Sequence, residues 1–156
     1  MSRPVNHTTF TIVRDLPGSP RHAFRFWSEP ELKRRWNDCH ADWTVLESGF
    51  DFREGGSEVL LWRMPEGQTL GVRTHYFGVV PTKRIVYAYE MSLDAASVST
   101  SLVTVEFAPG SKGTTMTFTE QAAFLDGSDP KARQIGTNDG FDRLVAVIEQ
   151  ENAVQH

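Results

Sequence analysis

Hydrophobic and polar residues alternate along much of the chain, which is the pattern of β-strands with one buried and one exposed face. The alternation is clearest where Met116 and Phe118 are interleaved with Thr115, Thr117 and Thr119. Alternation and β-branched content together predict seven strands, near residues 8–16, 42–48, 57–64, 70–80, 84–93, 98–108 and 113–124. Short turns separate the last six, so we expect neighbouring strands to pair antiparallel.

Two short helices are expected between the first and second strands. Ser19 and Pro20 form a helix start, because serine accepts hydrogen bonds from free backbone N–H groups and proline is preset for the first helical position. Ser28 and Glu31 repeat the signal as a capping box. The apolar residues that share one face of these helices are Phe24, Trp27, Leu32 and Trp36.

A long C-terminal helix is expected from Asp129 and Pro130 to about residue 152. Gly136 and Gly140 lie inside it, and each costs about 1 kcal/mol relative to alanine, so its first half is weak unless packing compensates. The apolar stripe of this helix consists of Phe141, Leu144, Val145 and Ile148, with Asn138 one turn earlier at the same azimuth.

This order of elements predicts an α+β helix-grip fold in one domain over residues 1–156. A curved seven-stranded antiparallel sheet must cover its apolar face, and the C-terminal helix is the only long amphipathic element that can do so. A strongly bent sheet rarely seals onto one helix along its full length. We therefore expect a cavity between sheet and helix, closed by the two short helices.

Composition and charge exclude several functional classes. The formal net charge of −4 leaves no excess positive field for nucleic acid or for anionic lipid. No apolar run is long enough to span a membrane, and residues 1–7 lack the apolar stretch of a secretion signal, so we expect a cytoplasmic protein. Cys39 cannot form an internal disulfide, and Cys39-His40 has no second pair at ligand spacing. We therefore expect no metal and no cofactor.

Several short stretches, each weak alone, occur in an order that covers nearly the whole chain. They are Pro20–Phe24, Trp27–Pro30, Trp36, Asp51–Gly56, Val79–Met91, Ser99–Phe107, Gly113–Thr115 and Phe118–Gly127. Together they resemble the START-like superfamily, also called SRPBCC, in the branch similar to the C-terminal domain of the activator of the heat-shock-protein-90 ATPase. The resemblance implies the same helix-grip fold in a single START-like domain. It implies much less about function, because the superfamily contains lipid carriers, plant-hormone receptors, polyketide cyclases and co-chaperones.

Two polar residues are candidates for acid–base chemistry. Glu120 continues the alternation of the last strand, so we expect it to point inward, where it either acts on a ligand or pairs with a cation such as Arg133. The ion pair is the preferred interpretation. His75 alternates with Phe77 and Val79 and is able to relay a proton or bind a ligand carbonyl, but a hydrogen-bonded structural role is preferred.

The predicted ligand-binding set combines aromatic side chains with these polar groups. It consists of Trp43, Trp62, Arg73, His75, Phe77, Tyr89, Met116, Phe118, Glu120, Asn138 and Phe141. A dense core alone would explain most of the aromatic content. Arg53, beside Asp51, is either an anion-binding group at the mouth of the pocket or half of a local ion pair in a turn, and the turn is preferred.

The preferred hypothesis is that the domain binds a small, largely apolar ligand, aromatic or similar to a polyketide or lipid, without turnover. One alternative is a cyclase-like enzyme that uses Glu120 and His75 without a metal, which requires both side chains to face one cavity. The other is a co-chaperone-like module that binds a protein through its outer surface and needs neither residue. A homodimer and a protein partner are left open.

Overall fold

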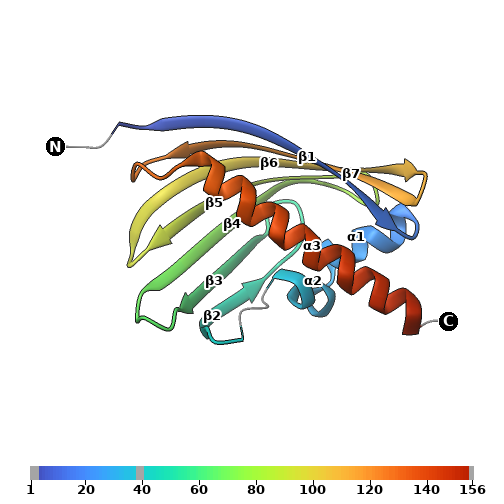
Figure 1. Cartoon of the computed structure of the whole chain (residues 1–156), viewed down its shortest axis with the longest axis horizontal. Coiled ribbons are helices and arrows are strands. Elements are labelled where there is room, and N and C mark those ends of the chain that lie inside the picture. The colour runs from blue at the N-terminus through green and yellow to red at the C-terminus, as the bar shows by residue number, and fades with distance from the viewer. Residues whose placement is uncertain (1–3, 38–40, 155–156) are drawn as a thin grey trace.

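The structural elements occur in the order that the sequence predicts. The structure is a computed structural model and describes residues 4–37 and 41–154. One strand, two short helices, six strands and a long helix follow one another along the chain (Figure 1). Their bounds are β1 (Asn6–Pro17), α1 (Pro20–Ser28), α2 (Pro30–Asn37), β2 (Thr44–Phe50), β3 (Ser57–Arg63), β4 (Thr69–Val80), β5 (Arg84–Leu93), β6 (Ala96–Gly110), β7 (Gly113–Phe124) and α3 (Pro130–Val154).

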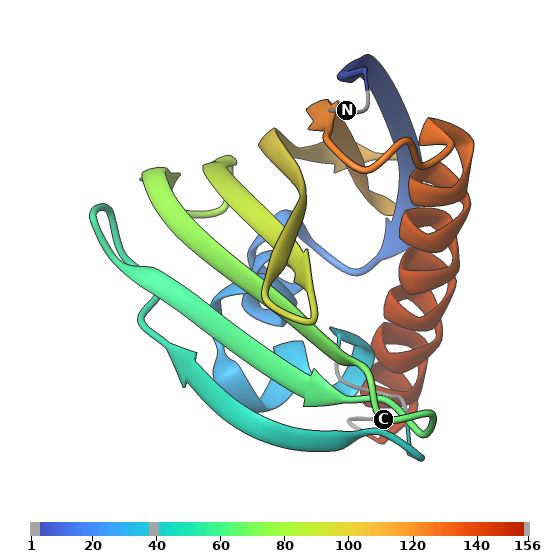
Figure 2. The same ribbon diagram turned by 90° about the vertical axis from the view of Figure 1, so that its left-hand side faces the viewer.

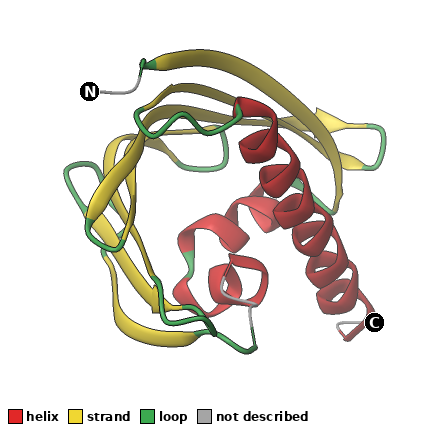
Figure 3. Ribbon diagram, turned by 60° about the vertical axis from the view of Figure 1, so that its left-hand side comes forward, coloured by secondary structure: helices red, strands yellow, loops and turns green. Residues whose placement is uncertain are grey.

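All seven strands form one antiparallel sheet in the order β1-β7-β6-β5-β4-β3-β2. The first strand joins the last one, with Asn6 opposite Phe124 and Pro17 opposite Gly113. Figure 2 shows the sheet bending away from α3 towards its other edge, and in Figure 3 the helices lie on its concave side. The sheet stays open, with β1 and β2 as its edges. The predicted α+β helix-grip fold is confirmed.

The starts of α1 and α3 follow the capping signals in the sequence, whereas Ser28 of the expected capping box is the last residue of α1 and α2 begins at Pro30. The Ser19 side chain accepts a hydrogen bond from the backbone N–H of His22 at 3.2 Å, at the start of α1. At the start of α3, Asp129 Oδ1 accepts from the backbone N–H of Lys131 at 3.0 Å. The two short helices are tied together where Trp36 Nε1 donates to the Phe26 carbonyl oxygen at 2.8 Å.

Helix α3 packs through the apolar stripe that the sequence predicts. Phe141, Leu144 and Ile148 are buried, and the Phe141 ring lies against the rings of three other elements, with centroids 6.1 Å from Trp27, 6.2 Å from Trp36 and 5.0 Å from Phe118. Within the described part of the chain, no helix is long and apolar enough to cross a membrane.

Strand β4 changes its inward face partway along. Its register with β5 shifts between Tyr76 and Gly78. Before the shift Thr74 and Tyr76 are buried, while after it Val79 packs against the core. An extra residue in one strand reverses the alternation of faces beyond it. The shift therefore decides which side chains of β4 reach the interior.

Candidate functional site

A cavity of about 210 Å³ lies between the concave face of the sheet and the three helices. Side chains from β3, β4, β5 and β7 form one wall, and side chains from α1, α2 and α3 form the other. Seven of the nineteen described lining residues are aromatic: Trp27, Trp36, Trp62, Tyr87, Tyr89, Phe118 and Phe141. The predicted space between sheet and helix is therefore present.

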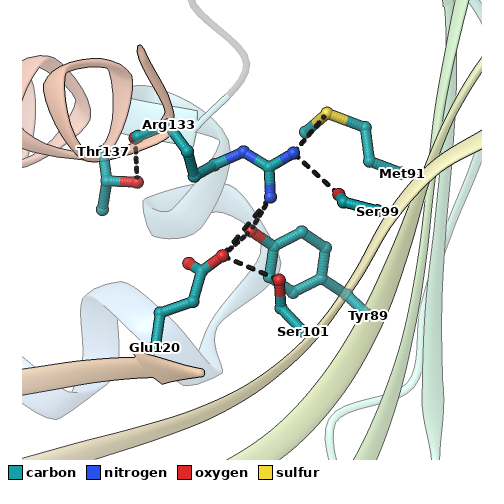
Figure 4. A network of polar contacts seen from close by, with 7 residues as sticks. All are labelled: Tyr89, Met91, Ser99, Ser101, Glu120, Arg133 and Thr137. Carbon is teal, nitrogen blue, oxygen red and sulfur yellow. Dashed lines mark hydrogen bonds and ion pairs between the residues drawn. The ribbon is translucent and has the colours of Figure 1, made fainter. Parts of the chain in front are cut away.

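One buried polar cluster in the cavity wall is centred on Glu120 (Figure 4). Its side chain is 1% exposed, and Oε2 accepts hydrogen bonds from the Tyr89 hydroxyl at 2.7 Å and the Ser101 hydroxyl at 2.8 Å. Arg133 Nη1, from the first turns of α3, lies 3.3 Å from the same oxygen. Arg133 Nη2 also donates to the Ser99 hydroxyl at 2.7 Å. The carboxylate thus has the partner that a buried charge requires.

A second buried polar cluster occupies another part of the wall. Lys33 Nζ lies 2.6 Å from Glu58 Oε1, and the Tyr76 hydroxyl is 3.1 Å from Nζ and donates to Oε1 at 3.2 Å. Lys33 Nζ also lies 5.0 Å from the centroid of the Phe50 ring. Burial lowers the pKa of Lys33, but the charge of Glu58 and the two hydrogen bonds outweigh burial, so the pKa is raised overall. Lys33 therefore stays charged inside the fold.

A row of three tyrosines connects the two clusters. Tyr87 stands between Tyr76 and Tyr89, with ring centroids 5.8 Å and 6.2 Å away. Tyr76 bonds to Glu58 and Tyr89 to Glu120, whereas the Tyr87 hydroxyl has no hydrogen-bond partner among the described residues. Burial, and then the neighbouring Tyr89 and Glu120, raise the pKa of Tyr87 well above its usual value. Its hydroxyl therefore stays protonated and is able to donate.

Two glycines of α3 form part of the helical wall. A Cβ atom at Gly136 would meet nothing within 4 Å, and one at Gly140 would meet only Arg143 Nη2, at 3.6 Å. Neither glycine has the positive φ that excludes other residues. Packing therefore does not compensate for their cost to the helix, and their effect is to keep this side of the cavity open.

Five of the predicted ligand-binding residues line the cavity: Trp62, Tyr89, Phe118, Glu120 and Phe141. Three others lie elsewhere in the interior or at its edge. Met116 is fully buried in the core, Asn138 accepts hydrogen bonds from Arg14 on β1, and the Trp43 ring packs on Trp62 with centroids 6.1 Å apart. Binding roles for all of these residues stay predictions.

Arg73, His75 and Phe77 do not face the cavity, and the expectation that they would do so is wrong. All three are exposed on the outer face of β4, where Arg73 lies 3.5 Å from Glu90 and the His75 and Phe77 rings pack together at 4.8 Å. The cause is the register shift in β4 between Tyr76 and Gly78. Val79, beyond the shift, packs inward, but simple alternation counted back from Val79 assigns the residues before the shift to the wrong face.

The Asp51–Arg53 segment forms the local ion pair that the sequence favours. Arg53 Nε lies 3.0 Å from Asp51 Oδ2, and both side chains are more than half exposed and lie outside the cavity lining. An arginine at the mouth of the pocket was the wrong alternative at this position. Cys39 and His40 lie outside the described residues.

The sequence analysis does not identify Lys33, Glu58, or the two glycines of α3 as parts of the cavity wall. The signal for Glu58 was present, because it alternates with Leu60 and Trp62 on β3 just as Glu120 alternates with Phe118 on β7. Lys33 stands next to Leu32 and three residues before Trp36, so it lies at the margin of the apolar face of α2. An inward carboxylate on a strand needs a cation, and a lysine at the margin of an apolar helix face is a candidate for that cation.

Comparison with known proteins gives close matches in sequence and fold. The model of the family described as Activator of Hsp90 ATPase homolog 1-like protein matches residues 17–149. A solved structure of a protein from Rhizobium leguminosarum is similar over 94% of this chain and 97% of that chain, with 43% identity and a TM-score of 0.89. The Mll3558 protein from Rhizobium loti is 38% identical, with a TM-score of 0.85 over 92% of this chain and 99% of that one.

More distant similarity is confined to the fold. An AHSA1-like protein from Aeromonas hydrophila has a TM-score of 0.71 at 19% identity, over 93% of this chain and 94% of that chain. No functionally curated protein matches the chain. The matches therefore establish the family and the fold, and only the residues of the cavity indicate what the protein binds.

Proposed function

The chain belongs to the family of Activator of Hsp90 ATPase homolog 1-like proteins, and from this premise we propose that it binds a small, largely apolar, aromatic ligand in the cavity between sheet and helices. The observation that carries the proposal is the cavity of about 210 Å³ with its aromatic lining. Aromatic rings that meet a planar ligand edge to face or offset add to the energy of apolar burial. Proteins of this family typically bind hydrophobic ligands, which agrees with the proposal.

The size of the cavity selects among apolar ligands. An apolar cavity of about 150 Å³ is large enough to bind benzene. A cavity of about 210 Å³ therefore suits a ligand of one or two rings and is small for a steroid or a long acyl chain. The glycines of α3 support the same conclusion, because alanine at either position would reduce the space for a ligand and would otherwise stabilise the helix.

The polar groups in the wall fit binding of a neutral ligand. Lys33 is paired with Glu58 and Arg133 with Glu120, so these four charges cancel before any ligand enters, and among the described residues Arg143 is the lining cation outside these pairs. A few fixed polar groups in an apolar cavity orient a ligand and add specificity. The cyclase-like alternative loses one of its two groups, because Glu120 lines the cavity while His75 is exposed on the opposite face of the sheet.

The test is a titration of the purified protein with naphthalene, indole, a long-chain fatty acid and a steroid. We expect the two-ring compounds to raise the melting midpoint and to quench tryptophan emission, because Trp27, Trp36 and Trp62 line the cavity. The steroid and the fatty acid should do neither at equal concentration.

A filled cavity provides the control. Gly140→Leu places a side chain into the cavity and should abolish the effect of naphthalene, whereas Ala146→Leu, at an exposed position of the same helix, should not. If no two-ring compound changes the midpoint or the emission, or if Gly140→Leu binds as well as the wild type, the proposal is wrong.

A further inference from the structure

Both buried carboxylates in the cavity wall keep one oxygen without a protein partner. All hydrogen bonds to Glu120 from described residues end on Oε2, and all those to Glu58 end on Oε1. Figure 4 shows the second Glu120 oxygen turned away from Arg133, Tyr89 and Ser101. An ionised carboxylate has about four lone-pair positions, and each is an acceptor only. Glu120 Oε1 and Glu58 Oε2 are thus free to accept from a ligand.

These free oxygens are not sealed inside the protein. Among the described residues, the side-chain nitrogen and oxygen atoms that are both fully buried and unpaired are His22 Nε2 and Trp27 Nε1. The free oxygens of Glu58 and Glu120 are absent from this set, and both residues line the cavity. Each oxygen therefore keeps some exposed surface, and leaving it without a hydrogen bond when a ligand fills the cavity and excludes water would cost free energy.

Tyr87 offers the complementary group two strands away from Glu120 on the same face of the sheet. Tyr87 is opposite Val103, and Val103 is opposite Glu120, so the two residues share one row across β5, β6 and β7. Both line the same cavity, and the Tyr87 hydroxyl is protonated and without a described partner. Tyr87 and Glu120 thus supply a donor and an acceptor that are both unused by the described protein.

A single hydroxyl group satisfies a donor and an acceptor together, because its oxygen accepts while its proton is donated. On the basis of the proposed function, we propose that the ligand is a small hydroxylated aromatic whose hydroxyl accepts from Tyr87 and donates to Oε1 of Glu120. An aromatic carboxylate would instead bring a negative charge towards the two carboxylates. It would favour the region of Arg143, a lining residue that donates to the Trp36 carbonyl oxygen and forms no ion pair with a described carboxylate.

The test compares four compounds with one ring system: naphthalene, 2-methoxynaphthalene, 2-naphthol and 2-naphthoate. The methoxy compound accepts a hydrogen bond but cannot donate one. We expect 2-naphthol to bind at least tenfold more tightly than the other three, because a hydrogen bond to a charged group contributes more than a neutral one.

The decisive variant is Tyr87→Phe, which removes only a hydroxyl that has no partner in the described protein. Its melting midpoint should equal that of the wild type, its affinity for 2-naphthol should fall about five- to tenfold, and its affinity for naphthalene should not change. Tyr76→Phe removes a hydroxyl that is bonded to Glu58 and is not part of the lining. It should leave the ratio of the two affinities unchanged.

Each outcome separates this inference from the proposed function. Equal binding of 2-naphthol and naphthalene overturns the hydroxyl pairing while binding of aromatics stands. Tighter binding of 2-naphthoate overturns it in favour of an acid held near Arg143. An unchanged preference for 2-naphthol in Tyr87→Phe also overturns it. Failure of all four compounds to bind overturns both proposals.

Discussion

Arg133 Nη1, on the first part of α3, lies 3.3 Å from Oε2 of the fully buried Glu120 on β7. The pair therefore joins the weak, glycine-containing half of the helix to the sheet. The same carboxylate turns its other oxygen away from the cluster (Figure 4). Glu120 thus has the structural partner that the sequence favours and also lines the cavity, so the two interpretations of this residue do not exclude one another.

Glu120→Gln should lower the free energy of unfolding by about 1–3 kcal/mol. The amide keeps the shape and accepts from Tyr89, but the charge of Arg133 loses its buried counterion. Urea unfolding measures the difference. Glu90→Gln is the matched control, because Glu90 pairs with Arg73 on the exposed face of the sheet, and it should change stability by less than about 0.5 kcal/mol. A Glu120→Gln protein as stable as the wild type would contradict the role of the pair.

The Lys33–Glu58 pair should behave as a buried unit. Lys33→Met leaves the Glu58 carboxylate buried without its cation, which should cost about 3–5 kcal/mol. Adding Glu58→Leu removes that charge and should recover most of the loss, because apolar replacement of both partners is often neutral. A double-mutant cycle by urea unfolding checks this, and additive losses in the double variant would count against the pair.

The inward face of a strand is predictable from sequence only while its alternation is regular. β7 alternates without interruption, and Glu120 was placed inward correctly. β4 contains a register shift, so Val79 and His75 lie on opposite faces although they are four residues apart. Gly78 stands at the shift, and a glycine inside a strand often marks a bulge, but the pattern does not show whether β4 is irregular there because that depends on how β4 pairs with β5.

Ion pairs between elements that are distant in the sequence cannot be predicted from the hydrophobic pattern, for a different reason. Lys33 and Glu58 belong to a helix and a strand whose approach depends on the curvature of the sheet. Periodicity gives the face of each element and says nothing of which faces meet. Arg133 was identified as a partner for Glu120 because an inward carboxylate needs a cation and one lies near in the chain.

Gly136→Ala should stabilise the protein by about 0.5–1 kcal/mol, because alanine is the better helix former and its Cβ meets nothing within 4 Å. Gly113→Ala provides the contrast, since Gly113 has φ of 123° and a Cβ there would collide with the backbone of Gly18. It should be destabilising. Melting midpoints of both variants check the expectation, and a destabilised Gly136→Ala would show that this glycine is needed by the fold.

Alkaline pH should destabilise the fold through the tyrosine row. The three tyrosines of the chain are Tyr76, Tyr87 and Tyr89, and burial is the largest cause of the raised pKa of each, to about 12 for Tyr76. Between the ordinary tyrosine pKa of about 10 and these higher values, the unfolded chain has lost protons that the folded chain still holds. Stability therefore falls as pH rises above about 10, and Tyr76 alone would contribute about 2–3 kcal/mol of that loss by pH 12.

The raised pKa of Lys33 has the same sign, because the unfolded lysine loses its proton first. Ultraviolet absorbance of tyrosinate measures the ionisation directly, and circular dichroism measures folding in the same samples. We expect little tyrosinate near pH 10, and its appearance at higher pH should coincide with unfolding. Tyr87→Phe should make the alkaline loss of stability shallower while leaving stability at neutral pH unchanged. Tyrosine ionisation at its ordinary pKa in a protein that remains folded would show that this row is open to water.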